Sequence, residues 1–294
     1  MRNVIGVITA RMTSTRLPGK VMHEIAGKTN FAHHVERMKS VKGLDRVCLA
    51  TSKDPKNKVL IKEAERLDCS WYAGAEQDLL ERHIKLCERE NADAVIRVTC
   101  DCPLFNIEAT SRFVAEFKKE YRDFIYCSNM TIIQGTLSEL ISYSAMLKMH
   151  ESYRGPGISM PIRENMSMYN TLGLEIDIDL CRPEYRLTVD EPADLNLIRH
   201  IYDSLYKGKP LSLYEVYTWL DDNPEIAQIN MNVGIKGCNQ YGANLMEKPE
   251  YSIVKSGKKF VILDSQKRYV NPMKFVLKLA EMFPETEKKT EKHI

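Results

Sequence analysis

The sequence lacks long hydrophobic runs: no apolar stretch approaches the ~20 residues that a membrane-spanning helix needs. Residues 1–8 form a short apolar run that charge soon follows, so they predict a buried strand and not a signal peptide. The formal net charge of the 294 residues is only +2, which is too small for a general nucleic-acid or membrane binder. These absences favour a globular cytoplasmic protein with no nucleic-acid and no membrane partner.

Cysteine pairs of the kind that bind zinc or form redox dithiols are also absent. The eight cysteines are scattered, and the one close pair, Cys100 and Cys102, has a single residue between its members, where such motifs have two. We therefore expect free thiols in a reducing compartment. Neither a G-x-x-x-x-G-K-[ST] phosphate loop nor a G-x-G-x-x-G dinucleotide motif is present, so any nucleotide site must be built differently.

Short apolar runs alternate with amphipathic stretches, which is the pattern of β-α-β units around a parallel sheet. Strands are predicted at 4–8, 46–50, 70–72, 94–98, 123–127 and 171–178. Helices are predicted at 31–39, 58–67, 79–90 and 190–206, and within 140–150. Residues 151–170, rich in glycine and proline, predict a loop or lid outside the packed core. Such sheets bind ligands at the carboxyl ends of their strands, so the segments 10–20 and 99–104 are the places to search.

The pattern changes near the end of the chain. Residues 251–263 predict a small hairpin with its turn at Ser256-Gly257, and 285–294 are highly charged. We therefore predict a main domain over 1–230 and a C-terminal extension over 231–294.

The segment 10–20 carries three cations and three hydroxyls; they are Arg11, Arg16 and Lys20, and Thr13, Ser14 and Thr15. A bound triphosphate needs fixed cations and many donors, because charge grows on the leaving pyrophosphate during transfer. Arginine suits bidentate phosphate contacts, and lysine acts as a mobile point charge. Pro18-Gly19 is expected to bend the loop so that Lys20 folds back over the phosphates. The alternative is a solvated basic loop that binds no ligand.

Two aspartates stand at comparable places later in the chain. Asp101 follows the strand at 94–98, where a carboxylate can hold a hard cation that bridges phosphate oxygens, although an aspartate before a proline turn is also common for local reasons. Asp190 ends a short apolar run before a helix, and taken alone this position favours an N-cap. Together with the basic loop, the two aspartates predict one magnesium site.

The stretch 8–21 reads I-T-A-R-M-T-S-T-R-L-P-G-K-V, and later segments read A-T-S (50–52), G-A-E-Q-D-L-L-E-R (74–82), D-C-P-L (101–104) and T-V-D-E-P (188–192). In this order they resemble the motifs of the cytidylyltransferase family of the spore coat polysaccharide biosynthesis protein F type. The resemblance covers about residues 1 to 230. It extends more distantly to the synthetases that make CMP-linked sugar acids.

The resemblance implies an α/β fold: a Rossmann-like, GT-A-like nucleotidyltransferase of three layers with a mixed, mainly parallel sheet, often forming a homodimer. It implies that Arg11, Arg16 and Lys20 act on the triphosphate of CTP, with Ser14 and Thr15 beside them, and that Asp101 and Asp190 hold Mg²⁺. The residues implied around the cytidine are Ala10, Thr51, Ser52, Asp78 and Arg82. The reaction is then an in-line attack by an acceptor oxygen on the α-phosphorus of CTP, with pyrophosphate leaving.

Two segments depart from the family pattern. After Ser128-Asn129 the chain reads Q-G-T-L-S-E, where the family form is closer to P-x-G-x-D-x-E, so Leu137 replaces an acidic residue. The family's R-E-H-V-T before P-Y-I-R is missing, and Gly157–Arg163 stands near its place. Both segments are expected to face the acceptor, so we infer that CTP use is retained and the acceptor has changed. The predicted acceptor contacts are Asn129, Glu139 and Arg163; each could instead make only a local hydrogen bond.

The sequence thus predicts an enzyme that transfers CMP to a small acidic or phosphorylated acceptor, such as a sugar acid, a phosphometabolite or a phosphonate. The product would serve the synthesis or modification of a surface polysaccharide, such as a capsule. One alternative is a guanylyl- or uridylyltransferase acting on a sugar phosphate, because base choice depends on few contacts. Another is a non-catalytic nucleotide-binding homologue, against which the retained cations and aspartates argue.

Overall fold

The computed structural model describes residues 2–128, 135–153, 157–180, 182 and 184–233, and the backbone of 251–256, 259–264 and 269–270. The chain divides into two compact units, 1–176 with 185–234 and 177–184 with 235–294. The predicted site residues that the structure describes all belong to the first unit. Asn129 lies outside the described residues. The division into a domain over 1–230 and an extension over 231–294 stays a prediction.

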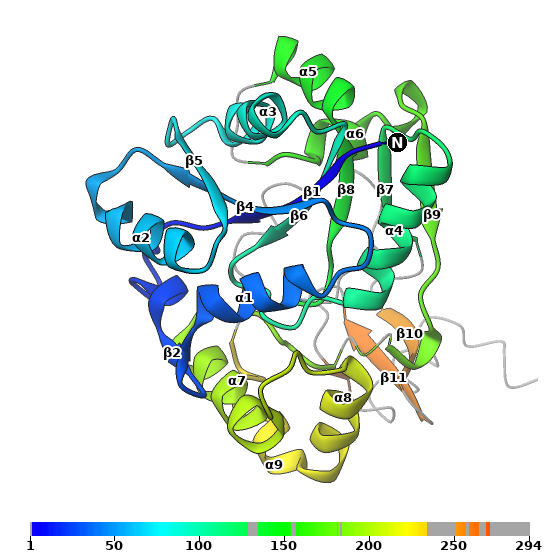
Figure 1. Cartoon of the computed structure of the whole chain (residues 1–294). Coiled ribbons are helices and arrows are strands. Elements are labelled where there is room, and N and C mark those ends of the chain that lie inside the picture. Colours follow the sequence, from blue (N-terminus) through cyan, green and yellow to red (C-terminus); the bar gives the residue numbers. More distant parts are fainter. Residues whose placement is uncertain are drawn as a thin grey trace, which may run out of the picture. The chain divides into compact units, whose positions relative to one another are not determined.

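A mixed sheet forms the centre of the first unit (Figure 1). Among the described residues its strand order is β5 (Ser70–Gly74), β4 (Arg46–Ser52), β1 (Val4–Thr9), β6 (Ala94–Thr99), β8 (Glu139–Ser142), β7 (Phe124–Cys127) and β9 (Thr171–Leu174). β8 runs antiparallel to both neighbours, and the other adjacent pairs are parallel. The order reverses at β1, with β4 and β5 on one side of it and β6 on the other. The predicted mixed, mainly parallel sheet is confirmed.

Helices cover both faces of this sheet, which gives the three predicted layers (Figure 1). One face carries α3 (Leu79–Glu90), α5 (Tyr143–Ser152) and α6 (Met160–Glu164), and the other carries α1 (Asn30–Lys39), α2 (Lys58–Arg66) and α4 (Ile107–Lys119). A further group comprises α7 (Pro192–Leu205), α8 (Leu213–Asp222) and α9 (Pro224–Ala227). Shorter elements are β2 (Glu24–Ile25), β3 (Lys28–Thr29) and the 3₁₀ turns η1 (Lys20–Met22), η2 (Pro55–Asn57), η3 (Met166–Met168) and η4 (Ile178–Leu180).

The central strands are mainly apolar because both faces of the sheet are covered. Val4, Ile5, Val7 and Ile8 of β1 are all fully buried. Between them, a Cβ on Gly6 would lie 2.6 Å from the Met38 side chain of α1, so the glycine is what allows this helix to pack so closely on the strand.

Two predictions about the middle of the chain were wrong. Residues 151–170 are not merely a loop outside the core: α6 forms there, and Ile158 and Ile162 are buried in the cluster that also holds Phe124. Pro161 lies in the first turn of α6, where proline is well tolerated because the N–H group that it lacks would have no partner within the helix. The strand predicted at 171–178 ends at Leu174, because Asp177 accepts hydrogen bonds from Asp179 and Leu180 and so forms a turn.

The second unit contains the hairpin that the sequence predicts. β10 (Tyr251–Ser256) pairs antiparallel with β11 (Lys259–Asp264), and β11 pairs with β12 (Tyr269–Val270). Gly257, predicted in the turn, lies outside the described residues.

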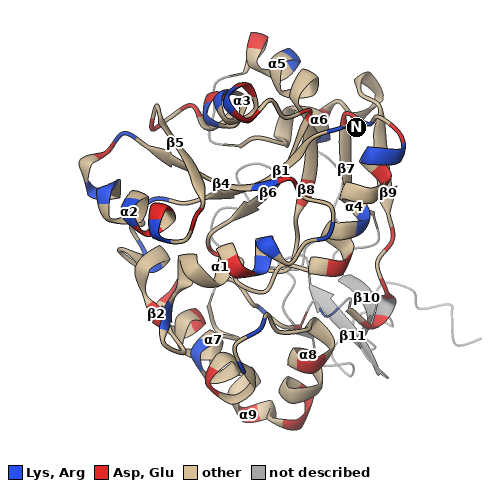
Figure 2. Ribbon diagram, in the orientation of Figure 1, with Lys and Arg blue, Asp and Glu red and all other residues tan. Residues whose placement is uncertain are grey.

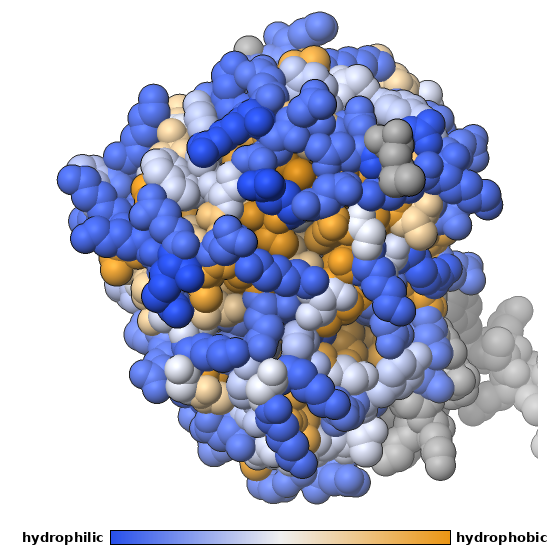
Figure 3. Space-filling model, viewed as in Figure 1, coloured by the Kyte–Doolittle hydropathy of each residue, from blue (hydrophilic) through white to orange (hydrophobic). Residues whose placement is uncertain are grey.

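The surface of the first unit mixes both signs of charge. α2, α3 and α4 each carry basic and acidic side chains (Figure 2), and hydrophilic residues cover most of the viewed face, with smaller hydrophobic areas between them (Figure 3). In the described part of the chain no helix is long and apolar enough to cross a membrane.

Candidate active site

Three segments meet at the carboxyl edge of the sheet, where the strand order reverses. The loop 10–20 leaves β1 and the segment 100–106 leaves β6, and these strands are neighbours, with Thr9 opposite Thr99. The third segment, 187–191, is tied to the second: the Val189 amide and the Thr188 hydroxyl both donate to the Asp101 carbonyl, at 2.7 and 3.0 Å. Ligands of open α/β sheets bind at such a reversal.

Lys20 lies at the centre of this meeting point. Its ammonium nitrogen is 3.2 Å from Asp101 Oδ2, 2.8 Å from Asp190 Oδ1 and 2.9 Å from the Val189 carbonyl oxygen. The three side chains are only 13%, 27% and 17% exposed for Lys20, Asp101 and Asp190. The structure therefore brings both predicted metal ligands and one predicted triphosphate ligand together.

Lys20 and Asp101 stabilise each other's charged forms. Burial alone would lower the pKa of Lys20, but Asp101 and Asp190 raise it by more, so it lies above its ordinary value. Burial alone would raise the pKa of Asp101, but Lys20, Thr99 and Cys102 lower it to about 2. At neutral pH Lys20 and Asp101 are therefore both charged.

Asp190 is free for this role because it does not cap a helix. The N-cap of α7 is Glu191, whose partner in a capping box is Asp194. Asp194 also accepts from the Asp190 amide at 3.0 Å and from Arg186 Nε at 2.7 Å. The local alternative for Asp190, an N-cap, is therefore wrong, and the neighbouring Asp194 fixes the backbone from which Asp190 reaches Lys20.

The basic loop folds back as predicted. Gly19 adopts a left-handed conformation (φ 67°), and the Lys20 amide donates to the Leu17 carbonyl at 3.2 Å. Arg16 lies 3.1 Å from Asp190 Oδ1, and so joins Lys20 at the same carboxylate. Of the predicted hydroxyl ligands, Ser14 accepts from the Leu17 amide, and Thr15 is exposed.

Arg11 lies at the other side of the loop, where it is half exposed and pairs with Glu76. Arg82 is buried and holds the backbone around Glu76, because its guanidinium donates to the carbonyls of Ala75 and Glu76 at 2.9 and 2.8 Å. Asp78 caps α3 and lies 2.8 Å from His150 Nε2. In this structure Arg82 and Asp78 therefore support the wall of the site, and their contact with cytidine stays a prediction.

The remaining predicted nucleotide contacts line the ends of β1 and β4. Ala10, Thr51 and Ser52 are buried, and the Thr51 hydroxyl has no hydrogen-bond partner among the described residues. Ser52 is held by Asn57, whose amide donates to its hydroxyl at 2.8 Å.

The predicted acceptor residues Glu139 and Arg163 lie together, with Arg163 Nη2 3.1 Å from Glu139 Oε2. A residue that the sequence analysis missed completes the group: Arg97 Nη1 lies 2.9 Å from Glu139 Oε1. The available signal was a single charged residue inside the apolar strand A-V-I-R-V. Asn129, the third predicted acceptor contact, is outside the described residues.

The cysteines next to Asp101 pack rather than react. Burial raises the pKa of the Cys100 and Cys102 thiols well above the ordinary value, so neither is a thiolate at neutral pH. The described cysteines, six in all, are free thiols.

The oxygens around Lys20 suit a magnesium ion. Two carboxylates and a carbonyl converge on one cation, and Mg²⁺ in such enzymes takes one or two carboxylates together with waters and substrate phosphates. In the described residues no group of three or more His, Cys, Asp or Glu side chains could hold a metal by itself. A metal here would therefore share its coordination with the substrate and would require the Lys20 ammonium to move.

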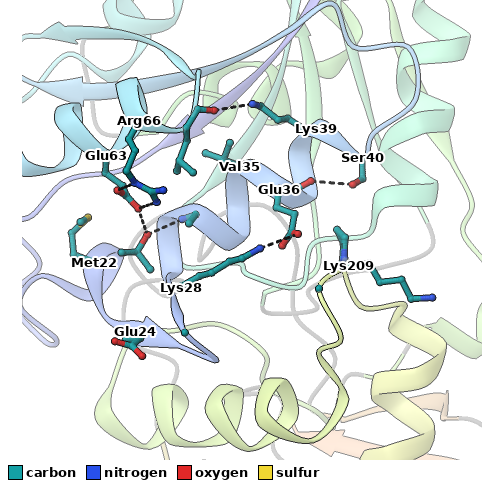
Figure 4. A pocket seen from close by; sticks show the side chains of 16 residues that line it. Met22, Glu24, Lys28, Val35, Glu36, Lys39, Ser40, Glu63, Arg66 and Lys209 are labelled. Atoms are coloured by element: carbon teal, nitrogen blue, oxygen red, sulfur yellow. Dashed lines mark hydrogen bonds and ion pairs between the residues drawn. The ribbon is translucent and has the colours of Figure 1, made fainter.

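A cavity of about 770 Å³ lies elsewhere, beside α1, between the β2–β3 hairpin, the end of α2 and residues 208–210 (Figure 4). None of the predicted site residues lines it. Four of its charged side chains pair with one another: Lys28 donates to Glu36 at 3.1 Å, and Arg66 donates to Glu63 at 2.7 Å (Figure 4). We therefore place the candidate active site at the sheet edge and not in this cavity.

Comparison with known proteins gives a matching family model, two relatives and one similar solved structure. A sequence model of the family described as cytidylyltransferase matches residues 5–216. An uncharacterized protein of Methanocaldococcus jannaschii is 30% identical over 244 residues, which are 81% of this chain and 98% of that protein. The spore coat polysaccharide biosynthesis protein SpsF of Bacillus subtilis is 27% identical over 235 residues, or 77% and 98% of the two chains. The solved structure of a cytidylyltransferase from Leptospira borgpetersenii superposes with a TM-score of 0.72 at 25% identity, covering 81% of this chain and 100% of that one.

Proposed function

This chain belongs to the cytidylyltransferase family, and from that premise we propose that it transfers CMP from CTP to a small acidic or phosphorylated acceptor with release of pyrophosphate. The observation that carries the proposal is the convergence of Lys20, Asp101 and Asp190 at the reversal of strand order. These residues come from three separate segments, each of which follows a sheet strand or precedes a helix at the ligand-binding edge.

In the proposed transfer the basic residues bind phosphate oxygens and the acidic residues bind the metal ion. An acceptor oxygen attacks the α-phosphorus, the bond to the β-phosphate oxygen breaks, and charge accumulates on pyrophosphate. Arg16 and Lys20 both pair with Asp190, and they would exchange that carboxylate for phosphate oxygens when CTP binds. Arg11 adds a third cation from the outer side of the loop. Mg²⁺ held by Asp101 and Asp190 would neutralise further phosphate charge when bound.

The relatives support a role in surface polysaccharides, since one of them is named for spore coat polysaccharide biosynthesis. The product would then be a CMP-linked sugar acid, or a CDP-like or CMP-phosphonate anhydride if the acceptor brings its own phosphorus. A homodimer in the cytoplasm stays a prediction.

The test is incubation with Mg²⁺, one of CTP, UTP or GTP, and a panel of sugar acids, phosphorylated metabolites and phosphonates. We expect pyrophosphate release when CTP is the nucleotide and none with UTP or GTP. The mass of the product should equal that of the acceptor plus a cytidylyl group. Turnover only with UTP or GTP would favour the alternative transferase. Nucleotide binding without turnover on any acceptor of the panel would favour a non-catalytic homologue.

A further inference from the structure

Glu139 is a buried carboxylate that is shared by two arginines. Arg97 Nη1 lies 2.9 Å from one of its oxygens and Arg163 Nη2 lies 3.1 Å from the other. The Glu139 side chain is 7% exposed, whereas Arg97 and Arg163 are 22% and 46% exposed. Two cations on one anion leave an excess positive charge, and the arginines carry the accessible atoms.

Both arginines are held in place by their surroundings. Arg97 and Glu139 face each other across the antiparallel pair β6–β8. Arg163 lies over the rings of Phe124 and Tyr126, 5.0 and 5.7 Å from their centroids, and comes from α6, whose Ile162 is anchored in the core. Such packing fixes the planes of the guanidinium groups before any ligand arrives.

The arginines keep donors for a further partner. A guanidinium has five N–H donors, and Glu139 takes one from each arginine. The Nε of Arg97 is buried and has no hydrogen-bond partner among the described residues. Planar guanidinium edges bind carboxylate and phosphate groups through two parallel hydrogen bonds.

The cluster also lies at the right place. Side chains alternate along a strand, so Val95, Arg97 and Thr99 share one face of β6. Val95 is buried in the core cluster on the side of the sheet that α3, α5 and α6 cover. Thr99 is the last residue of β6 and lies two residues, or about 7 Å, further along the strand toward Asp101. That separation suits a small metabolite that is held at one end and attacks through the other.

We propose that Arg97 and Arg163 form an oxyanion subsite that binds the carboxylate, phosphate or phosphonate group of the acceptor. Glu139 is then a positioning residue that orients the two guanidinium groups and does not itself contact the acceptor. Arg97 becomes the specificity-determining residue of this subsite. This inference rests on the proposed function, and it adds the group by which the acceptor is recognised.

Kinetics of single variants test the subsite, with the acceptor that the nucleotide panel identifies. Arg97→Gln and Arg163→Gln should each raise the KM for the acceptor by about tenfold or more while the KM for CTP stays within about twofold, because a lost charge-assisted hydrogen bond is worth at least this much. Glu139→Gln should raise the acceptor KM less than Arg97→Gln does. The acceptor KM of Arg97→Lys should lie between those of wild type and Arg97→Gln, because lysine keeps the positive charge but lacks the planar guanidinium group.

Arg122→Gln is the matched control. Arg122 is also 22% exposed, pairs with Glu120 at 2.6 Å and has a buried Nε without a partner, but it precedes β7 at the opposite edge of the sheet. An acceptor KM that changes equally in Arg97→Gln and Arg122→Gln would overturn the subsite. If Arg97→Gln does not fold, the half-exposed Arg163→Gln decides by the same criterion.

A binding measurement separates failure of the subsite from failure of the proposed function. Calorimetry with gluconate and with glycerol phosphate, in the presence of a non-hydrolysable CTP analogue, needs no turnover and distinguishes a carboxylate from a phosphate as the recognised group. Binding to wild type that Arg97→Gln loses and Arg122→Gln keeps supports the subsite, even if CMP transfer is absent. Binding that is equal in all three proteins, or absent from all three, refutes it.

Discussion

The Lys20 ammonium nitrogen lies 2.8 Å from Asp190 Oδ1, although the two residues are 170 positions apart in the chain. Asp101 Oδ2 lies 3.2 Å from the same nitrogen. One lysine thus occupies the position between two carboxylates where a divalent cation would be held. We therefore expect Lys20 and a metal ion to compete for the same oxygens, and a nucleotide that draws the lysine away to favour metal binding.

We expect Lys20→Met to bind Mn²⁺ more tightly than wild type without nucleotide, by about tenfold or more, because the competing positive charge is gone. Electron paramagnetic resonance of free Mn²⁺ measures this affinity. The same variant should release pyrophosphate about 100-fold more slowly, since a donor to the developing charge is lost. Lys28→Met is the control, because Lys28 also pairs with a carboxylate, Glu36, but outside the site. Mn²⁺ affinity that is unchanged in Lys20→Met would show that the lysine is no competitor.

Asp190 and Asp194 are four residues apart and should respond differently to the same substitution. Asp190→Asn should lower pyrophosphate release about 100-fold or more, with little change in thermal stability. Asp194→Asn should destabilise the fold by roughly 3 kcal/mol, because Asp194 is fully buried and pairs with Arg186. Thermal melting and a pyrophosphate assay on both variants separate the two roles. A strongly destabilised Asp190→Asn would mean that this carboxylate is structural.

The sequence alone was sufficient to predict the strands of the β-α-β half of the fold. The apolar runs and helical periodicity placed the strands that became β1, β4, β5 and β6 to within a few residues, and three of these strands, β1, β4 and β6, are largely buried. The same reasoning failed for α6, because burial of Ile158 and Ile162 depends on neighbours far away in the chain. It also missed Arg97, since an arginine in a strand gains a role only when β8 brings Glu139 opposite it.

Gly135 should be the least replaceable glycine that is near the acceptor segment. Its φ is +95°, and a Cβ there would lie 2.2 Å from the Leu187 carbonyl carbon, so it packs directly on the segment that leads to Asp190. Gly135→Ala should cost about 3 kcal/mol from backbone strain and steric overlap together. Gly208→Ala is the control, with a φ of +77° and open space around the position, and should cost only about 1 kcal/mol. Urea unfolding of both variants checks this, and equal losses would refute the overlap.

Acid should destabilise the protein through its buried histidines. Burial lowers the pKa of His34 to about 4 and that of His83 to about 3, from 6.5 in the unfolded chain. Below pH 6.5 the unfolded state therefore binds more protons than the folded state, and stability falls as the pH drops through this range. The slope is up to about 1.4 kcal/mol per pH unit for each histidine.

Urea titrations between pH 7.5 and 4.5 measure that slope. His83→Gln should flatten it, whatever the variant does to stability at neutral pH, because one of the protons taken up on unfolding is removed. His200→Gln, at an exposed position of α7, should leave the slope unchanged. A slope in His83→Gln equal to that of wild type would exclude this histidine as a source of acid lability.

The antiparallel direction of β8 has an evolutionary consequence. Because β8 runs opposite to β6, its first residue, Glu139, lies opposite Arg97, and the residues leading into it, 135–138, lie at the ligand-binding edge. The residues predicted to act on the triphosphate and its metal come instead from the loop after β1 and from the segments around Asp101 and Asp190. We therefore expect that a lineage can change the entry to β8, and with it the acceptor, while it inherits the residues predicted for the nucleotide unchanged.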